Sequence, residues 1–384
     1  MRAIVLLSDA YGGRGGIALY NRYFLRALCE YTETEEVLAL PRSITYEMEQ
    51  IPSNLVYRTE SAGGKLRYLL HCLRLLTRDK RADLIICGHL HLLPFAWLIS
   101  WRHRCPVLQL TFGIEAWTPT VHRLVNTLCR RLKAFISIRR LTASCFKAWA
   151  GIENAHFYYL PNCIDDAQFA PAPKRHDLVR KFGLEGKQVV MTTGRMDSID
   201  FERRKGFDEV LEALPELRRR IPEIAYLIVG DGDDRPRLEQ KARELGVADI
   251  VRFSGYVRDS EKADYYRLAH VFAMPGSNPL FDRYPFRFVF LEALACGVPV
   301  VGCRLEDPSE RDDLDAQQLI IQVNPNDNAD IVRGILYALA HPLTPGNSAI
   351  RTYCYAAFRD RLHRYLRDIV GDLAHDKTAS RCEA

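Results

Sequence analysis

The sequence lacks the cysteine pattern of a disulfide-stapled or zinc-binding protein. Eleven cysteines are scattered over 384 residues, and no two of them form a C-x-x-C pair. Thiols without paired spacing argue against a disulfide framework and against a structural zinc site, so we expect no metal. No secretory signal is recognisable at the amino terminus, and a reducing cytoplasm is therefore the expected compartment.

Long apolar runs are also missing. The longest, residues 92–101, is too short and too interrupted to cross a bilayer, so any membrane contact is expected to be peripheral. The chain has no G-x-G-x-x-G loop in the register that binds dinucleotides, and no nucleic-acid-binding motif accompanies its basic residues. We therefore expect no cofactor and no nucleic-acid partner.

The positive charge that is present is unevenly distributed. Residues 1–170 hold 21 Lys and Arg against 14 Asp and Glu, a surplus of seven, whereas the whole chain has a net charge of +5. Two segments, residues 58–81 and 118–149, account for most of the surplus and interleave basic with apolar residues. This pattern predicts either an amphipathic surface for anionic lipid or solvated helix faces, and both interpretations stay open.

The order of the apolar segments predicts an α/β protein with two domains. Short apolar runs typical of buried parallel strands alternate with helical patterns, and the chain is long enough for two domains. We expect these domains over 1–170 and 171–347, a helix over 348–370 that ends at Gly371, and a disordered tail over 372–384. The expected strands include residues 2–8, 37–40, 84–87, 107–110, 134–138, 188–193 and 226–229.

Residues 283–301, RYPFRFVFLEALACGVPVV, are expected to form a loop, a helix and a buried strand. Amides at the free start of this helix, near Phe288 and Val289, favour an anion such as phosphate. Glu292 lies one turn further on among apolar residues, where a carboxylate needs a partner. A ribose diol is one candidate for that partner.

Two cations bracket the loop that follows the expected strand 188–193. Arg195 comes directly after that strand and Lys205 precedes the next helix, so that both can converge on one anion. A guanidinium together with an ammonium neutralises a diphosphate leaving group without a metal ion. We therefore predict that Arg195 and Lys205 are the catalytic residues.

The amino-terminal half contains two further candidate sites. Glycines at positions 12, 13, 15 and 16 separate the first strand from a helix. They predict either a cradle for phosphate or sugar, with Gly15 and Gly16 at the start of the helix, or a tight packing turn. His89 and His91 follow the strand 84–87 at its carboxyl end, the edge where α/β sheets bind ligands. For His89 we favour a structural or acceptor-contacting role over metal ligation.

Several of these stretches resemble glycosyltransferase family 4, whose members are retaining enzymes of the GT-B fold. The segment FVFLEALACGVPVV is similar to the family's carboxy-terminal signature, and Arg195 and Lys205 match its G-R and K-G pair. The resemblance implies that Glu292 holds the nucleotide ribose. It also implies that Tyr256 and Val257 lie where the backbone contacts the nucleotide base.

The resemblance implies a fold and an activity as well. GT-B enzymes have two Rossmann-like, doubly wound domains facing across a cleft, with the glycine loop (here Gly15 and Gly16) beside donor phosphate and acceptor. Their last helix crosses back to the first domain. The implied activity is transfer of a sugar from a nucleotide diphosphate sugar to a glycan or lipid-linked acceptor, in the biosynthesis of a cell-surface polysaccharide such as lipopolysaccharide or exopolysaccharide. In the retaining GT-B mechanism that the resemblance implies, the leaving phosphate takes the acceptor proton, so no protein base is required.

The chain departs from the family at the donor-sugar end. Tyr284 stands where the family has its first glutamate, with Arg287 three positions on, and Phe112 replaces the histidine of a segment whose glutamate is kept as Glu115. Because of these losses, a second interpretation is a catalytically inert nucleotide-sugar-binding or scaffold protein. A third interpretation is a phosphorylase or epimerase. Loss of a carboxylate and gain of Arg283 and Arg287 predict a donor with a deoxy or an acidic sugar.

Overall fold

The chain forms two compact units. A computed structural model describes residues 1–77, 80–196, 205–276, 288–304, 319–343 and 348–382. The first unit comprises residues 1–163 and 355–384, and the second comprises residues 164–354. The chain therefore passes between the units twice, after Cys163 and after Cys354. The domain boundary expected after residue 170 lies within the second unit.

The first unit is built on a parallel sheet with the strand order β3-β2-β1-β4-β5-β6-β7. The strands are short and largely buried on both faces, as an all-parallel sheet requires. The order reverses at β1, so the carboxyl ends of β1 and β4 flank a topological switch point, where open α/β sheets bind ligands. In the described residues these strands are β1 (Arg2–Leu7), β2 (Glu36–Pro41), β3 (Leu55–Tyr57), β4 (Leu84–Cys87), β5 (Val107–Thr111), β6 (Ala134–Ser137) and β7 (His156–Tyr159).

Helices cover both faces of this sheet. Right-handed crossovers place α1 on one face and the helices α2 to α5 on the other, because the chain reverses its direction across the sheet after β3. Ile4 and Leu6 of β1 face the second group, where they share an apolar core with Tyr68 of α2 and Phe146 of α5. The described helices of the unit are α1 (Gly16–Cys29), α2 (Lys65–Arg74), α3 (Leu93–His103), α4 (Arg123–Cys129), α5 (Arg140–Ala150) and α15 (Tyr355–Cys382).

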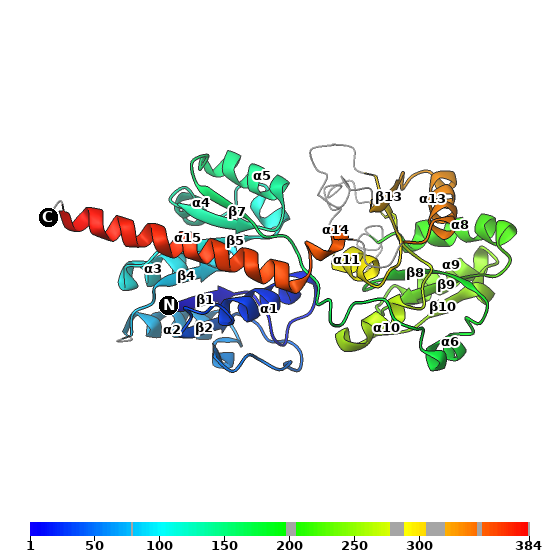
Figure 1. Cartoon of the computed structure of the whole chain (residues 1–384), viewed down its shortest axis with the longest axis horizontal. Helices are drawn as coiled ribbons and strands as arrows, with labels where there is room; N and C mark the ends of the chain where they lie inside the picture. Colours follow the sequence, from blue (N-terminus) through cyan, green and yellow to red (C-terminus); the bar gives the residue numbers. More distant parts are fainter. Residues whose placement is uncertain (78–79, 197–204, 277–287, 305–318, 344–347, 383–384) are drawn as a thin grey trace. The chain divides into compact units, whose positions relative to one another are not determined.

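The carboxy-terminal helix α15 belongs to the first unit and lies beside α1 (Figure 1). Phe358 of α15 meets Tyr20 of α1 edge-on, with ring centroids 5.5 Å apart. The imidazole Nε2 of His363 donates a hydrogen bond of 2.7 Å to the carbonyl oxygen of Ala27. These contacts join the last helix to the first one, on the sheet face opposite α2 to α5.

Two expectations about this end of the chain are wrong. The single helix expected over 348–370 is divided into α14 (Ser348–Arg351) and α15, and α15 runs through Gly371 to Cys382 where a disordered tail was expected. Gly371 does not end the helix because its φ is not positive. A glycine inside a helix costs only about 1 kcal/mol relative to alanine, and the leucine, alanine and lysine that follow favour the helix.

The second unit has a parallel sheet with the strand order β10-β9-β8-β11-β12-β13. Here the order reverses at β8, so the carboxyl ends of β8 and β11 flank the switch point. In the described residues the strands are β8 (Gln188–Thr193), β9 (Ile224–Val229), β10 (Val251–Phe253), β11 (Val271–Met274), β12 (Val300–Cys303) and β13 (Ile320–Val323).

Two apolar cores hold the second unit together, one on each face of the sheet. Side chains alternate along the strands, so Val189 and Met191 pack against α6, α10 and α11, whereas Val190 packs against α8, α9 and α13. The described helices are α6 (His176–Phe182), α8 (Phe207–Arg220), α9 (Arg235–Glu244), α10 (Lys262–Tyr266), α11 (Phe288–Ala295), α13 (Asn328–Ala340) and α14.

Two doubly wound, parallel-sheet units confirm the expected α/β class. The expected strands over 84–87 and 188–193 coincide with β4 and β8. In the described part of the chain, no helix has both the length and the apolar character needed to cross a membrane.

Candidate functional site

Two loops of the second unit meet at the carboxyl edge of its sheet, beside the switch point. The loop after β8 begins at Gly194 and the loop after β9 begins at Gly230, and a Cβ atom on Gly230 would lie 2.0 Å from the carbonyl oxygen of Gly194. Both glycines have positive φ angles, 156° and 134°, which other residues rarely adopt. The close approach of the two loops therefore depends on glycine at both positions.

Lys205 and Arg195 are in direct contact at this edge. The Lys205 ammonium Nζ donates a hydrogen bond of 2.6 Å to the carbonyl oxygen of Arg195. The lysine side chain crosses over Gly194, where a Cβ atom would lie 2.5 Å from Lys205 Cδ. The structure thus places the Lys205 ammonium against the backbone of Arg195, at the carboxyl end of β8. Whether they act on a diphosphate stays a prediction.

Glu292 of α11 is buried and has a partner inside the second unit. Its Oε2 accepts a hydrogen bond of 2.6 Å from the hydroxyl of Tyr266, the last residue of α10. Burial raises the pKa of the Glu292 carboxyl, although Lys262 and the hydrogen bond from Tyr266 act in the opposite direction. The sequence predicted that this carboxylate needs a partner, but it gave no sign that Tyr266 would be one.

The start of α11 carries no negative charge. The helix begins at Phe288, the first described residue after a gap, and its first turn contains no acidic residue. Phe288 is buried and Val289 is partly buried. Anion binding by their amides stays a prediction. Tyr284 and Arg287, together with Arg283, lie outside the described residues.

The loop after β10 returns to the loop after β9. The amide of Gly230 donates a hydrogen bond of 3.1 Å to the carbonyl oxygen of Gly255, in an isolated antiparallel bridge. The next residue, Tyr256, is 55% exposed, whereas Val257 is buried. Tyr256 therefore presents its ring at the surface close to the loop that approaches Gly194. Contact with a nucleotide base stays a prediction for both residues.

The glycine loop of the first unit lies at the switch point of its own sheet. It follows β1 and ends at Gly15, whose φ of 97° precedes the first turn of α1. No side chain caps α1, and its first turn, which starts at Gly16, contains no acidic residue. Such a helix start favours an anion or a polar ligand.

His89 follows β4 on the other side of that switch point. Its Nδ1 accepts a hydrogen bond of 3.2 Å from the amide of His91, whose ring lies 5.0 Å from the ring of His89 and 5.3 Å from that of His122. Burial, together with His91 and Arg42, lowers the pKa of His89 to about 4. The imidazole is therefore neutral at pH 7, and its proton lies on Nε2 because Nδ1 is an acceptor. No group of three or more His, Cys, Asp and Glu within the described ranges is placed to hold a metal.

Phe112 and Glu115, both predicted in a sugar pocket, make contacts within the first unit. Phe112 is 7% exposed, and its ring meets Tyr20 edge-on at 5.4 Å. Glu115 Oε1 accepts hydrogen bonds from the amides of Phe112, at 2.6 Å, and of Gly113, at 3.1 Å. Burial raises the pKa of the Glu115 carboxyl, and these backbone hydrogen bonds oppose the rise. The carboxylate therefore holds the turn after β5, and a sugar contact stays a prediction.

Comparison with known proteins identifies the family. A family model described as glycosyl transferases group 1 matches residues 187–341. The GDP-mannose-dependent alpha-(1-6)-phosphatidylinositol monomannoside mannosyltransferase of Mycolicibacterium smegmatis is 38% identical over 321 residues, which cover 78% of this chain and 80% of that protein. The chain belongs to the glycosyl transferases group 1 family. The phosphatidyl-myo-inositol mannosyltransferase of the same organism is 35% identical to this glycosyltransferase over 208 residues, 54% of this chain and 47% of that protein.

Solved structures share the fold of this glycosyltransferase. Anabaena HepE in complex with UDP superposes with a TM-score of 0.70 at 17% sequence identity, covering 96% of this chain and 100% of that chain. The lipopolysaccharide outer core galactosyltransferase WaaB superposes with a TM-score of 0.64 at 13% identity, covering 96% and 99%. At these identities the likeness concerns the fold. Together with the two parallel-sheet units, it shows that the glycosyltransferase has the GT-B fold expected from the sequence.

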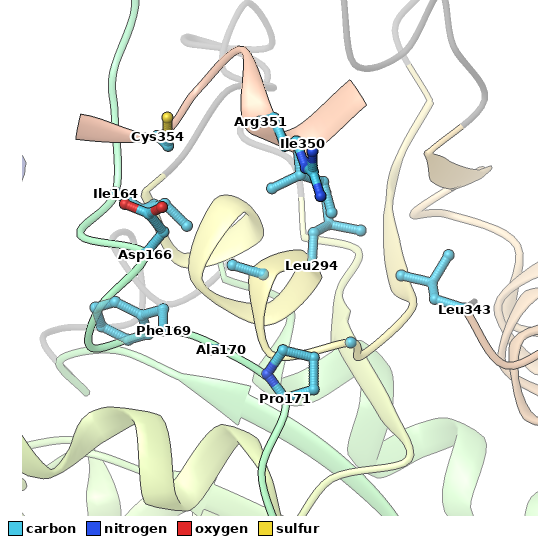
Figure 2. Close-up of a pocket in the computed structure, with 12 residues that line it drawn as sticks. Ile164, Asp166, Phe169, Ala170, Pro171, Leu294, Leu343, Ile350, Arg351 and Cys354 are labelled. Atoms are coloured by element: carbon cyan, nitrogen blue, oxygen red, sulfur yellow. The ribbon is translucent and has the colours of Figure 1, made fainter. Parts of the chain in front are cut away.

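The second unit of the glycosyltransferase also contains a pocket of about 270 Å³, away from the loops after β8 and β9. Figure 2 shows Leu294 of α11, Phe169 and Pro171 on its walls. The lining is mainly apolar, with one charged side chain of each sign in Asp166 and Arg351. The pocket lies at the carboxyl end of α11, whereas the predicted phosphate contacts lie at its amino end. It is therefore separate from the loops after β8 and β9.

Proposed function

We propose that this glycosyltransferase transfers a hexosyl group from a nucleoside diphosphate sugar to a lipid-linked glycan in the biosynthesis of a cell-surface glycolipid or polysaccharide. The observation that carries the proposal is the hydrogen bond from the Lys205 ammonium to the backbone carbonyl oxygen of Arg195, which places the lysine at the carboxyl end of β8. The M. smegmatis relative is named for GDP-mannose and phosphatidylinositol monomannoside. These names support GDP-mannose as the first donor to test and an inositol phospholipid mannoside as the first acceptor.

The proposed reaction retains the configuration at the anomeric carbon. The bond between C1 of the sugar and the diphosphate oxygen breaks, and the acceptor oxygen forms a new bond to C1 on the same face. The acceptor proton passes to the departing phosphate oxygen. Arg195 and Lys205 stabilise the charge that grows on the diphosphate, so that neither a metal ion nor a protein base is required.

The rest of the nucleotide is proposed to bind along the same edge of the second unit. Amides near Phe288 and Val289 assist the two cations at the diphosphate. Glu292 accepts hydrogen bonds from the ribose hydroxyls, and the segment at Tyr256 and Val257 contacts the base. In the first unit, the start of α1 and the neutral imidazole after β4 are proposed to meet the acceptor.

Turnover with defined donors and acceptors tests this function. The full chain is incubated with GDP-mannose and micelles of phosphatidylinositol mannoside, with and without EDTA, and released GDP is followed. We expect acceptor-dependent release that EDTA leaves unchanged, and an α-linked product by NMR. A β-linked product would overturn the retaining mechanism, and a loss of turnover with EDTA would overturn the metal-independent one.

The sequence also supports a different donor, and the same assay separates the two. Loss of a carboxylate at Tyr284 and the presence of Arg287 favour an acidic or deoxy sugar, because an arginine pairs strongly with a carboxylate. The panel therefore includes glucose, uronic acid and deoxyhexose donors, for wild type and Arg287→Ala. If GDP-mannose is used best and Arg287→Ala leaves the order of donors unchanged, the acidic or deoxy donor is excluded.

A catalytically inert nucleotide-sugar-binding protein is the second candidate, and the replacements at Tyr284 and Phe112 favour it. Calorimetric titration with GDP-mannose and with UDP-glucose distinguishes binding from catalysis. Tight binding of a donor without nucleotide release, with any acceptor tried, would establish this alternative and overturn the proposed transfer.

A further inference from the structure

A lysine amine and a histidine ring face each other at the amino edge of the second sheet. Lys174 lies in the segment before α6, and His270 comes directly before β11. The Nζ atom of Lys174 is 3.0 Å from Nε2 of His270. The loops after β8 and β9 lie at the opposite, carboxyl edge of the same sheet. The pair is therefore outside the proposed nucleotide site.

The backbone of β8 fixes the protonation of the His270 ring. Its Nδ1 lies 2.9 Å from the amide nitrogen of Val189, and an amide is a donor, so Nδ1 must accept. Turning the ring over would place a carbon atom against that amide. Burial, together with Lys174, lowers the pKa of His270 to about 4, so the ring is neutral at pH 7. A neutral imidazole carries one proton, which is therefore on Nε2.

The proton on Nε2 determines the charge of Lys174. A lysine ammonium has three donors and no acceptor, so it cannot form a hydrogen bond with an N–H group 3.0 Å away. A neutral amine has one lone pair, which accepts the hydrogen bond from Nε2 of His270, and two N–H groups. One of these groups donates a hydrogen bond of 3.1 Å to the carbonyl oxygen of Leu268. The contacts of Lys174 are thus those of a neutral amine.

The surroundings of Lys174 do not favour an ammonium. Burial lowers the pKa of the lysine, and among the described residues no carboxylate forms an ion pair with it. The charged groups nearby pair with one another: Arg175 with Asp177, at 2.6 Å, and with Asp264 of α10, at 3.2 Å. Arg267 also pairs with Asp264, at 2.9 Å. A desolvated lysine without a counter-charge is the arrangement that makes a lysine nucleophilic at neutral pH.

Two other lysines of the second unit show the usual arrangement, in which a carboxylate holds the ammonium. Lys241 of α9 donates to Asp208 of α8 at 2.6 Å, and Lys187 pairs with Glu223. In each case the negative charge of the partner stabilises the protonated lysine. The histidine beside Lys174 supplies a donor instead of a charge, and so acts in the opposite direction.

We propose that Lys174 is an acylation site, a nucleophilic amine that takes an acyl group from an acyl phosphate. The lone pair of Nζ attacks the acyl carbon, the bond from that carbon to the phosphate oxygen breaks, and inorganic phosphate leaves with the electron pair. The nitrogen then loses one proton to water and becomes a neutral amide. An acyl phosphate suits the site because its leaving group departs as an anion and needs no proton from His270. Lys174 is partly exposed, so a small acyl donor can reach it.

Competitive acetylation measures the state of the amine without a sugar donor or an acceptor, so its failure is distinct from failure of the proposed transfer. The full chain is treated with trace acetic anhydride at pH 7.5 and at pH 10, and each lysine is quantified by mass spectrometry. The ratio of labelling at the two pH values reports the fraction of neutral amine and cancels differences in access. We expect a ratio at least about threefold higher for Lys174 than for Lys181, an exposed lysine of α6. Equal ratios would overturn the proposal.

A change in the ring tests the cause. His270→Asn keeps an acceptor oxygen for the amide of Val189 and removes the N–H group that faces Lys174. We expect the labelling ratio of Lys174 to fall to within about twofold of that of Lys181, and the ratio of Lys187 to stay unchanged. The thermal unfolding midpoint shows whether the variant is folded; if it is not, the comparison in the wild-type protein still decides. An unchanged ratio for Lys174 in the folded variant would overturn the proposal.

Acetyl phosphate tests the acyl donor itself. The full chain is incubated with acetyl phosphate at pH 7.5, with inorganic phosphate as the blank, and acetyl groups on each lysine are followed over time. We expect Lys174 to be acetylated at least about threefold faster than Lys181, and Lys174→Arg to lose this early acetylation. If Lys174 reacts fast with acetic anhydride but no faster than Lys181 with acetyl phosphate, the amine is nucleophilic but an acyl phosphate is not its substrate, and the proposal is wrong.

Discussion

The hydroxyl of Tyr266 donates a hydrogen bond of 2.6 Å to the carboxylate of Glu292, and both side chains are almost completely buried. The two residues come from different helices, α10 and α11, on the same face of the second sheet. A buried carboxylate with a single hydroxyl donor has room for further hydrogen bonds, because an ionised carboxylate accepts about four. The pair therefore orients Glu292, and a hydrogen bond from this carboxylate to a ribose stays a prediction.

Tyr266→Phe tests whether this orientation matters. We expect it to weaken GDP binding several-fold and to lower the free energy of unfolding by about 1–2 kcal/mol, because a buried acceptor loses its donor. Glu292→Gln should also weaken GDP binding. Calorimetry and urea denaturation measure both effects. Tyr226→Phe is the control, since it removes a buried tyrosine hydroxyl that bonds to Thr192. Wild-type GDP affinity in both Tyr266→Phe and Glu292→Gln would show that the pair is structural only.

Arg195→Ala and Lys205→Ala are each expected to reduce kcat by about 10²-fold or more, with a smaller change in KM. The reason is that a cation at the diphosphate acts most strongly when the leaving group gains charge, in the transition state. Steady-state kinetics with the best donor of the panel give both constants. Lys187→Ala, on a partly buried lysine paired with Glu223 before β8, is the matched control. Near-normal kcat in both site variants would remove Arg195 and Lys205 from the mechanism.

Glu209 gives the second unit a predictable dependence on pH. Its Oε2 is buried and has no hydrogen-bond partner among the described residues, and burial raises the pKa of its carboxyl to about 7. The folded-state pKa lies above the unfolded value of about 4.5, so the folded protein holds the Glu209 proton more tightly than the unfolded chain does. The stability that the protonated carboxyl contributes is therefore complete below pH 4.5 and is lost as the pH rises through 7.

Glu209→Gln should therefore be as stable as wild type near pH 4.5 and more stable above pH 7, by roughly 1–3 kcal/mol. Urea denaturation at a series of pH values measures the difference. Glu244→Gln, on an exposed glutamate of α9, should show no such trend. A constant difference between Glu209→Gln and wild type across this range would mean that the carboxyl of Glu209 titrates normally.

Glu115→Ala should destabilise the first unit by about 1–3 kcal/mol, because the buried amides of Phe112 and Gly113 lose their acceptor. Glu115→Gln keeps one acceptor oxygen and should recover most of the loss. Denaturation and transfer rate are measured on the same preparations. If Glu115→Ala unfolds like wild type but loses donor turnover, the carboxylate contacts substrate and its structural role is refuted.

Local patterns in the sequence determined much of the fold. Apolar runs fixed the strands 84–87 and 188–193, since buried parallel strands must be apolar on both faces. In the structure, Gly194 and Gly230 begin the loops after β8 and β9, because positive φ and close approach both require glycine there. That Arg195 and Lys205 act together on one anion stays a prediction, although Lys205 does contact the backbone of Arg195. Gly371 was misjudged because a glycine ends a helix only where the backbone adopts positive φ, and the residue type does not decide that.

The tertiary structure decided which polar groups have partners and which apolar groups are covered. Tyr266 and Glu292 are 26 residues apart, and nothing local to either indicates that α10 and α11 pack side by side. The turn in which Glu115 binds the amide of Phe112 depends on the backbone after β5, which composition does not show. The stripe of Leu66, Leu70 and Leu73 has the same period as a core-facing stripe, so the sequence could not say which side of α2 is buried. Only packing against the sheet, which covers Tyr68 and Cys72, leaves the leucines exposed.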